Sequence, residues 1–269
     1  MTFTHLKKRI IPKLLIRHRN IGSSVRPVLV TTNQYKDVYD VGDPVSQAKI
    51  YEAQMADELI VLNINSTSTS ISDDPLMLDL IEQLASETFM PIAVGGSIRN
   101  LSDIACLLEH GADKVCMNAS AISNPALITE AANRFGTQCL VVSIDFCRNE
   151  NNQMIVFSKQ DACSKEMDVL TWVQHVVEAG AGEILLTDVD RDGTGQGLNC
   201  MMSRAVTDLI SVPVILSGGC GLAEHFIAGF EDGGAEAIAA GTFFCFRDQN
   251  PMQTRAQIRN AGIQIRMET

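Results

Sequence analysis

The chain contains an internal repeat in which segments of the first half return in the second half in the same order. The stretch PIAVGGSIRN at 91–100 returns as PVILSGGCGL at 213–222, and ADELIVLNI at 56–64 returns as AGEILLTDV at 181–189. The stretch GADKVCMNA at 111–119 returns as GAEAIAAGT at 234–242. The repeat restricts the fold to one with two similar halves, each built from short apolar runs and glycine-containing turns.

Short apolar runs alternate with amphipathic stretches along the chain. The runs are rich in Val, Ile and Leu, which is typical of buried parallel strands. The predicted strands lie near 9–15, 57–64, 91–95, 113–117, 139–145, 183–188, 213–217 and 236–240. Each is followed by a predicted helix, and the helices lie near 44–55, 74–87, 100–110, 124–135, 168–180, 200–210, 223–232 and 251–262. Eight such units predict an α/β fold, a (β/α)8 TIM barrel built from two similar half-barrels, as a single domain over 1–269.

The composition restricts the class of function. A formal net charge of −11 with scattered charges argues against nucleic acid as a partner, and no apolar run approaches the length of a membrane span. The first residues lack the features of a secretory signal. The eight cysteines form no CxxC pair and the five histidines are dispersed. We therefore expect a cytoplasmic protein with reduced thiols and with neither a metal site nor another cofactor.

The catalytic end of this fold is formed by the carboxyl ends of the strands. Asp145 stands there after a mostly apolar run, which predicts a catalytic carboxylate. The matching position of the first half is Leu15. A barrel with one carboxylate on each half can use the two as an acid–base pair, so this chain has lost one member of that pair. The long segments 16–43 and 146–167 at the same end are expected to form lids or hairpins over the site.

Glycine-rich turns at the same end predict phosphate binding, because glycines let backbone N–H groups approach an anion. SGGCG and AAGTFF follow adjacent strands of the second half, and VGGSIR and MNAS take the equivalent places in the first. The second half is the better equipped to bind phosphate, because it has Gly219, Gly241 and the hydroxyl of Thr242. The first half has Ser97, Asn118 and Ala119 at these places. The segment DVDRDGTGQG lacks the closing Glu of a calcium loop, so we expect it to help form the phosphate region instead. The candidate phosphate-binding residues are Gly96, Ser97, Asn118, Asp192, Gly193, Gly219, Gly241 and Thr242.

Charged residues open four of the strands at the opposite end of the barrel. They are Arg9, Glu58, Lys114 and Glu183. Such residues commonly close a barrel floor as a ring of salt bridges. The other interpretation is a gated entrance for a small molecule that passes through the barrel.

Together these motifs closely resemble the cyclase subunit (HisF) of imidazole glycerol phosphate synthase. The resemblance rests on KRIIPKLL, GDPV, DELIVLNI, VGGSIRN, GADKVCMNASA, CLVVSID, GAGEILLTDVDRDGTGQG, SGGCG and EHF, in this order over nearly the whole chain. It implies that a HisH-type glutaminase docks on the floor and that ammonia crosses the barrel to a bisphosphate substrate. It also implies that Asp145 is catalytic, that the four charged residues form the ammonia gate, and that Asp113 contacts the glutaminase.

The chain departs from the family at the cyclisation site. Leu15 stands where the family has its second catalytic Asp, and Asn63, Ser97 and Ala119 replace an Asp, a Gly and a Thr. PKLL replaces ACLD, and the lid at 17–42 is lengthened. These features resemble a divergent branch of glycosyl-amidation-associated proteins in surface-polysaccharide (lipopolysaccharide) biosynthesis. The resemblance implies a partner amidotransferase that converts a sugar acetamido group to an acetamidino group.

We therefore predict a synthase subunit that passes ammonia to a phosphate-bearing or nucleotide-sugar-linked acceptor, with cyclase activity impaired by Leu15. Three alternatives stay open. The chain is a working cyclase of histidine biosynthesis that uses Asp145 alone, a phosphosugar ketol-isomerase, or a non-catalytic scaffold and ammonia conduit. The isomerase alternative leaves the floor ring unexplained and also calls for two carboxylates.

Overall fold

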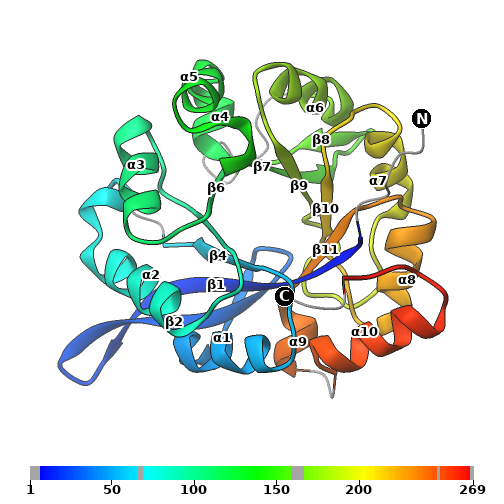
Figure 1. Ribbon diagram of the computed structural model, residues 1–269. Coiled ribbons are helices and arrows are strands. Elements are labelled where there is room, and N and C mark those ends of the chain that lie inside the picture. Colours follow the sequence, from blue (N-terminus) through cyan, green and yellow to red (C-terminus); the bar gives the residue numbers. More distant parts are fainter. Residues whose placement is uncertain (1–6, 66–68, 159–166, 247–248, 267–269) are drawn as a thin grey trace.

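The computed structural model describes residues 7–65, 69–158, 167–246 and 249–266, which form a closed barrel of parallel strands surrounded by helices (Figure 1). The barrel strands are β1 (Arg9–Ile21), β4 (Leu59–Asn63), β5 (Ile92–Gly95), β6 (Lys114–Met117), β7 (Leu140–Arg148), β9 (Glu183–Asp188), β10 (Val214–Ser217) and β11 (Ala237–Ala240). The ring closes where β11 pairs with β1. The predicted (β/α)8 barrel is therefore confirmed.

The helices cover the outside of the strand ring. They are α1 (Pro44–Ala53), η1 (Ile71–Asp73), α2 (Pro75–Glu87), α3 (Leu101–Glu109), α4 (Ala119–Ser123), α5 (Ala126–Phe135), η2 (Thr137–Cys139), α6 (Val169–Glu178), α7 (Cys200–Thr207), α8 (Ala223–Glu231), α9 (Thr242–Phe246) and α10 (Pro251–Asn260). Asp43, Asn100 and Asn250 cap their helices as a polar residue before an amphipathic stretch predicts. Asn124 instead ends α4, and Pro125 precedes α5 without a side-chain cap.

The alternation along β1 separates the two sides of the barrel wall. Ile10, Leu14 and Ile16 belong to the large apolar cluster that includes the surrounding helices. Ile11 belongs to a second cluster inside the barrel. Each of the remaining barrel strands also contributes a side chain to this cluster. Successive side chains of a strand point to opposite faces, so Arg9, Ile11, Lys13 and Leu15 all face inward.

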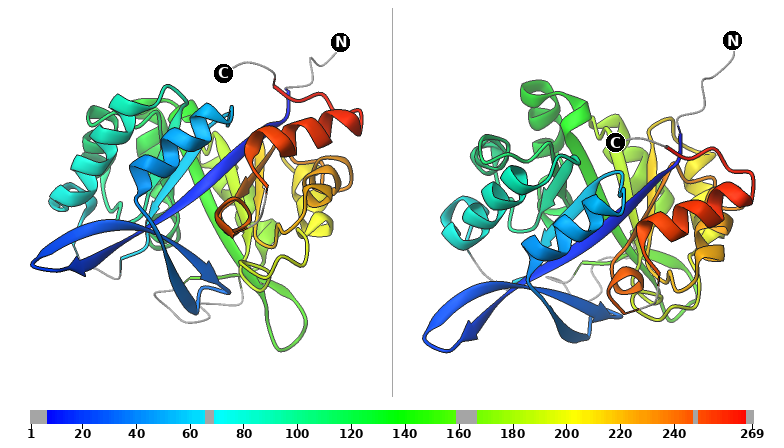
Figure 2. Two further views of the ribbon diagram at one scale, coloured as in Figure 1. Left: turned by 90° about the horizontal axis from the view of Figure 1, so that it is seen from below. Right: turned by 60° about the horizontal axis from the view of Figure 1, so that its bottom comes forward.

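The first barrel strand does not end at Leu15, as the sequence predicted, but continues to Ile21. It turns there and pairs antiparallel with β2 (Ser24–Asn33), which pairs in turn with β3 (Asp37–Gly42). The expected lid at 17–42 is thus a three-stranded extension. A smaller hairpin joins β7 to β8 (Met154–Val156), and both extend beyond the same end of the barrel (Figure 2). Residues 159–166 of the second long segment lie outside the described residues. No helix in the described part of the chain is long and apolar enough to cross a membrane.

Candidate active site

The four charged residues that open strands form a closed ring across the barrel floor. Arg9 donates to Glu58 at 2.7 Å and also pairs with Glu183. Lys114 Nζ lies 3.0 Å from Glu58 Oε2 and 2.9 Å from Glu183 Oε2. Each cation therefore contacts both carboxylates. Burial alone would raise the pKa of Glu58, but Arg9 and Lys114 together hold this pKa below its usual value, so Glu58 stays ionised.

An apolar layer separates the ring from the mouth of the barrel. It consists of Ile11, Ile60, Ala93, Cys116, Val141, Leu185, Ile215, Ala237 and Ala239, with Leu62 packed against it. Three of these side chains are alanines, and none of the layer carries a charge. A small neutral molecule that crosses this layer meets no ionised group between the floor and the mouth.

Asp145 lies on the inward face of β7 at the mouth of the barrel. The Asn118 amide donates to its Oδ2 at 2.8 Å, the Ser143 hydroxyl to its Oδ1 at 3.4 Å, and the Tyr35 hydroxyl also donates to it. Burial raises the pKa of Asp145 to about 6, although the Lys13 ammonium and the Tyr35 hydrogen bond act in the opposite direction. A carboxyl group that titrates near neutral pH is suited to accept and return a proton.

Lys13 is a second charged group at the mouth, and we did not identify it from the sequence. Its side chain is 5% exposed and enters the barrel from β1. The Nζ atom donates to the Ser217 hydroxyl at 3.0 Å and lies 3.8 Å from Asp192 Oδ1. Among the residues that the structure describes, the mouth thus brings a buried cation, Lys13, together with two carboxylates, Asp145 and Asp192.

The strand extension covers this cluster as a closed lid. Thr32 donates to Asp192 Oδ2 at 2.5 Å, and the Gln34 backbone N–H donates to the Asp192 carbonyl at 2.8 Å. Gly193 has a φ of +73°, and a Cβ there would lie 2.1 Å from the Thr32 carbonyl oxygen. Only glycine lets the lid approach this closely. The Tyr35 ring meets the Phe157 ring edge-on, with the centroids 6.0 Å apart.

Leu15 lies in an apolar cluster under the lid. Its side chain is 7% exposed and packs with Val28, Val30 and Leu62, with Val38 and Ile64 at the edge. The strand 1 position that carries a carboxylate in the family is therefore enclosed by aliphatic side chains. Asn63, which also replaces a family Asp, donates to Asp74 at 3.3 Å and accepts from Asn65 at 2.7 Å.

The candidate phosphate-binding residues divide into groups. The Asn118 side-chain amide donates a hydrogen bond to Asp145, and both Asp192 and Gly193 contact the lid. Gly96 and Ser97 follow β5, both with positive φ. On the other side, Gly219 follows β10, where a Cβ would lie 2.2 Å from the Gly197 carbonyl oxygen. Gly241 follows β11, and Thr242 is the first residue of α9.

The raised pKa of Asp145 makes the stability of the fold depend on pH. An Asp in an unfolded chain titrates near 3.9, so the folded protein loses stability as the pH rises from about 4 to about 6. Asp145→Asn has no charge to bury. We expect it to exceed the wild type by up to about 3 kcal/mol in free energy of unfolding above about pH 6, and to match it near pH 4. Thermal unfolding across this pH range measures the difference.

The exposed residue Asp37 supplies the control. The difference in stability between Asp37→Asn and the wild type is expected to stay constant over the same pH range. A stability difference for Asp145→Asn that is also independent of pH, or that shrinks as the pH rises, would contradict a raised pKa at Asp145.

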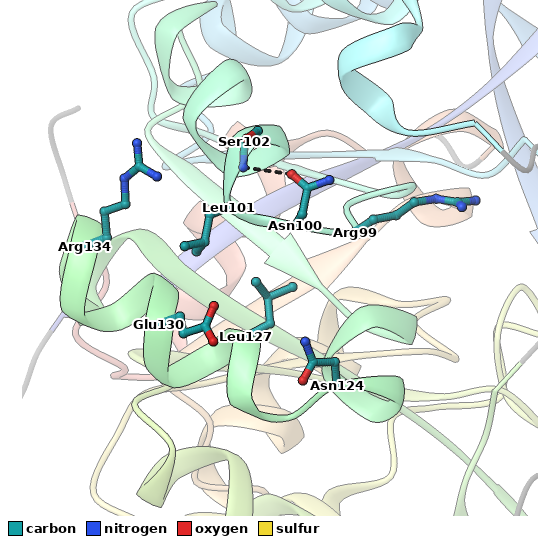
Figure 3. Close-up of a pocket in the computed structure, with 8 residues that line it drawn as sticks. All are labelled: Arg99, Asn100, Leu101, Ser102, Asn124, Leu127, Glu130 and Arg134. Atoms are coloured by element: carbon teal, nitrogen blue, oxygen red, sulfur yellow. Dashed lines mark hydrogen bonds between the residues drawn. The ribbon is translucent and has the colours of Figure 1, made fainter.

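The outer wall of the barrel carries a groove between α3 and α5 (Figure 3). It is lined by Arg99, Asn100, Leu101, Ser102, Asn124, Leu127, Glu130 and Arg134. None of the candidate site residues lines it. Among the residues that the structure describes, no three His, Cys, Asp or Glu side chains gather as metal ligands.

The chain is thus a TIM barrel with a charged ring at its floor, an apolar layer along its axis and a carboxylate at its mouth. The family described as "Histidine biosynthesis protein" matches residues 9–248. The chain is also 45% identical over 263 residues, 98% of this chain and 99% of the relative, to a protein of Prochlorococcus marinus (strain MIT 9313) named "Putative imidazole glycerol phosphate synthase subunit hisF2". The chain therefore belongs to the histidine biosynthesis protein family, among its HisF-type synthase subunits, as the sequence motifs predicted.

Proposed function

We propose that this HisF-type subunit receives ammonia from a glutaminase docked on the barrel floor and passes it along the axis to an acceptor at the mouth. One combination of observations carries the proposal. The floor ring is complete, with each cation contacting both carboxylates, whereas Leu15 replaces a carboxylate at the mouth. The features that admit ammonia are kept, and those that perform cyclisation are changed.

The closed ring supports a gate that a docked partner opens. Lys114 is the more exposed of the two cations, with 21% of its side chain accessible against 9% for Arg9. Movement of Lys114 alone would leave Arg9 bound to both carboxylates and open one side of the ring. A partner that binds the open arrangement more tightly shifts the equilibrium toward it.

The altered mouth favours an acceptor other than the cyclase substrate. Leu15 cannot exchange a proton, and the lid above it is built from paired antiparallel strands. We infer an acceptor of the kind used in sugar amidation for surface polysaccharide, phosphate-bearing or linked to a nucleotide sugar, with a sugar amidotransferase as a further partner. The protein then acts in the cytoplasm, as a lyase-type or cyclase-type subunit of a glutamine amidotransferase complex.

The acceptor's phosphate is proposed to bind mainly on the β10 and β11 side of the mouth. Gly219 and Gly241 lie in the turns after β10 and β11, where glycine lets an anion approach the backbone, and Thr242 adds a hydroxyl group. The opposite side, with Gly96, Ser97 and Asn118, is a poorer site because the Asn118 amide donates to Asp145. Asp192 and Gly193 hold the lid over the region between the two sides.

A second candidate function is imidazole glycerol phosphate synthesis in histidine biosynthesis. The name of the Prochlorococcus relative and the presence of Asp145 favour it. It requires another group to act as the missing acid. A chain that only conducts ammonia would not need a carboxylate at position 145. The three hydrogen bonds that hold Asp145 in place therefore argue against a mouth without a catalytic function.

Co-expression with a candidate HisH-type glutaminase tests the proposal. We expect a complex at micromolar concentration and faster glutamine hydrolysis in it. Asp113 is exposed at the floor and accepts the Ile92 N–H through Oδ2 at 2.8 Å. Asp113→Lys places a like charge against the basic partner surface that the family resemblance implies, and we expect it to weaken the complex at least about tenfold, or ~1.4 kcal/mol.

Asp113→Asn is the matched control, because it removes the charge and keeps a side-chain oxygen for the Ile92 N–H. Its effect is expected to lie between those of the wild type and Asp113→Lys. If no glutaminase associates at micromolar concentration, the ring is only the structural floor of the barrel and the proposed function is wrong.

A further inference from the structure

We propose that Lys13 is a specificity-determining residue whose ammonium group binds an oxyanion of the acceptor, a carboxylate or a phosphate, at the base of the mouth. The proposal adds a contact to the phosphate site on the β10 and β11 side, because it assigns an acidic group to the part of the acceptor that enters deepest. It deepens the proposed function and rests on it for the identity of the acceptor as the molecule that receives ammonia.

The alternation of β1 places Lys13 where the apolar layer ends. Ile11, the inward residue below Lys13 on this strand, belongs to the apolar layer. Leu15, the inward residue above, belongs to the apolar cluster under the lid. Lys13 is therefore the one charged side chain between two apolar positions of β1, at the level where a molecule that has crossed the layer reaches the mouth.

The buried ammonium group of Lys13 makes fewer hydrogen bonds than it can donate. Its side chain is 5% exposed, and its Nζ atom donates to Ser217 Oγ at 3.0 Å. Asp192 Oδ1 lies 3.8 Å away, which is too far for a hydrogen bond. An ammonium group has three N–H donors, so two of them have no acceptor among the residues that the structure describes. A buried cation in this condition is costly, and an oxyanion within hydrogen-bond distance would remove the cost.

The lid holds Asp192 from the side opposite Lys13. Thr32 donates to Oδ2 of Asp192 at 2.5 Å, and the Gln34 N–H donates to the Asp192 carbonyl oxygen at 2.8 Å. The contacts that fix this carboxylate therefore belong to the closed lid. A ligand that enters when the lid opens can approach Lys13 without breaking a hydrogen bond between Lys13 and Asp192, because none joins them.

Ser217 connects Lys13 to the phosphate side of the mouth. It is the last residue of β10, is 1% exposed, and directly precedes Gly218 and Gly219. Both glycines have positive φ, 92° and 103°. A turn of this kind lets an anion approach backbone N–H groups. An oxyanion beside Lys13 would therefore lie next to a glycine turn as well as to a cation.

The charge of Lys13 distinguishes between acceptors. A neutral group brought against Lys13 would leave the buried charge and its two free donors unpaired, which disfavours that acceptor. A carboxylate or phosphate group pairs with the charge and accepts the hydrogen bonds, which are stronger than those between neutral groups. The acceptor is therefore expected to carry an acidic group close to the atom that receives ammonia.

Binding of inorganic phosphate and of acetate tests the proposal and requires neither ammonia nor a partner. Nitrogen-15 NMR at constant ionic strength follows the Gly218 and Gly219 amide signals during each titration. The anion that binds more tightly distinguishes a phosphate group of the acceptor from a carboxylate group. We expect Lys13→Met to weaken binding of that anion about 10- to 100-fold, the usual contribution of a hydrogen bond to a charged group.

Asp192→Asn is expected to have the opposite effect. It removes the negative charge beside Lys13 and keeps an oxygen for the Thr32 hydroxyl, so the anion should bind more tightly than it does to the wild type. The double variant Lys13→Met/Asp192→Asn is expected to lose most of this gain, because no cation remains. Lys13→Gln keeps a donor for Ser217 without a charge, so it should behave like Lys13→Met and serves if Lys13→Met does not fold.

Lys8→Met is the matched control. Lys8 is a partly buried lysine that precedes β1 and donates to the Ala235 carbonyl, and its loss is expected to leave anion binding unchanged. Equal affinity of the wild type and both neutral Lys13 variants, or no saturable binding of either anion to the wild type, would overturn the inference. Failure of the glutaminase to associate would overturn only the proposed function.

Discussion

Supplied with ammonium salt and the bisphosphate substrate of the family's cyclase, the purified chain is expected to turn over slowly or not at all. Loss of one positioned acid–base group commonly costs about 10²–10⁴ in rate. Leu15 removes such a group, and Asn63 and Ser97 change its surroundings. The measurement is the rate of imidazole glycerol phosphate formation at saturating ammonium, without glutaminase. Turnover on the order of 1 s⁻¹ or faster would show that the mouth is a working cyclase site.

Two variants examine why the reaction is slow. Leu15→Asp restores the family's carboxylate, but places it among Val28, Val30 and Leu62 and two positions from the Lys13 ammonium. The double variant Lys13→Cys/Leu15→Asp restores the family's residues at both positions. We expect the double variant to exceed the single one in rate by about tenfold or more. Equal rates would mean that Lys13 has no influence on a carboxylate at the mouth.

The barrel itself could be predicted from the sequence because its determinants are local. A strand buried on both faces leaves a continuous apolar run, and a helix against it leaves a stripe. The residues of the floor ring could also be predicted from the sequence, because each of them opens such a run. They are Arg9, Glu58, Lys114 and Glu183. What the sequence could not show is that the ring closes, with both cations in contact with both carboxylates.

The extension of β1 was missed because its stability is not local. The segment RHRN after Ile16 is polar and resembles a loop, yet it pairs residue by residue with the segment 25–28. Strand formation here depends on cross-strand partners that lie in the next arm of the hairpin. The intrinsic strand propensity of the segment itself contributes little to it. The folding of this lid over the mouth also brings Tyr35 to Asp145. No spacing of residues in the sequence predicts this contact.

Lys13 was overlooked for a different reason. It follows Lys7, Lys8 and Arg9 within a few residues, so it resembles part of a basic surface segment. The available signal was the period of the strand. Lys13 stands four residues after Arg9 in an otherwise apolar run, and an inward Arg9 requires an inward Lys13. Combining the fold prediction with strand alternation would have identified a lysine inside the barrel.

The second large effect is expected at the floor, where α10 is tied to the start of the barrel. Arg255 lies 2.9 Å from Asp57 Oδ2, with side chains 6% and 1% exposed, and it also donates to the carbonyls of Met55 and Arg266. Asp57 accepts the Ile10 N–H at 2.7 Å. One guanidinium therefore joins α10, the segment before β4, and the chain after α10. Arg255→Met leaves a buried carboxylate without its cation, and we expect a loss of about 3–5 kcal/mol in the free energy of unfolding.

Urea unfolding measures this loss through the fluorescence of Trp172, the one tryptophan of the chain, which is buried in α6. Arg259→Met on the exposed side of α10 is the matched control, with an expected change within about 0.5 kcal/mol. The double variant Asp57→Asn/Arg255→Met removes both charges and is expected to recover part of the loss.

The pH dependence identifies the cause of the loss. Burial raises the pKa of Asp57, while the Ile10 N–H and Arg255 act in the opposite direction. Without Arg255 the pKa rises further, and a carboxyl group with a raised folded pKa lowers stability as the pH increases through that pKa. The deficit of Arg255→Met is therefore expected to be larger near pH 8 than near pH 5, because the protonated Asp57 of the variant needs no cation. A deficit that is equal at both pH values would assign the loss to packing of the arginine side chain and its carbonyl contacts, and not to the unpaired charge.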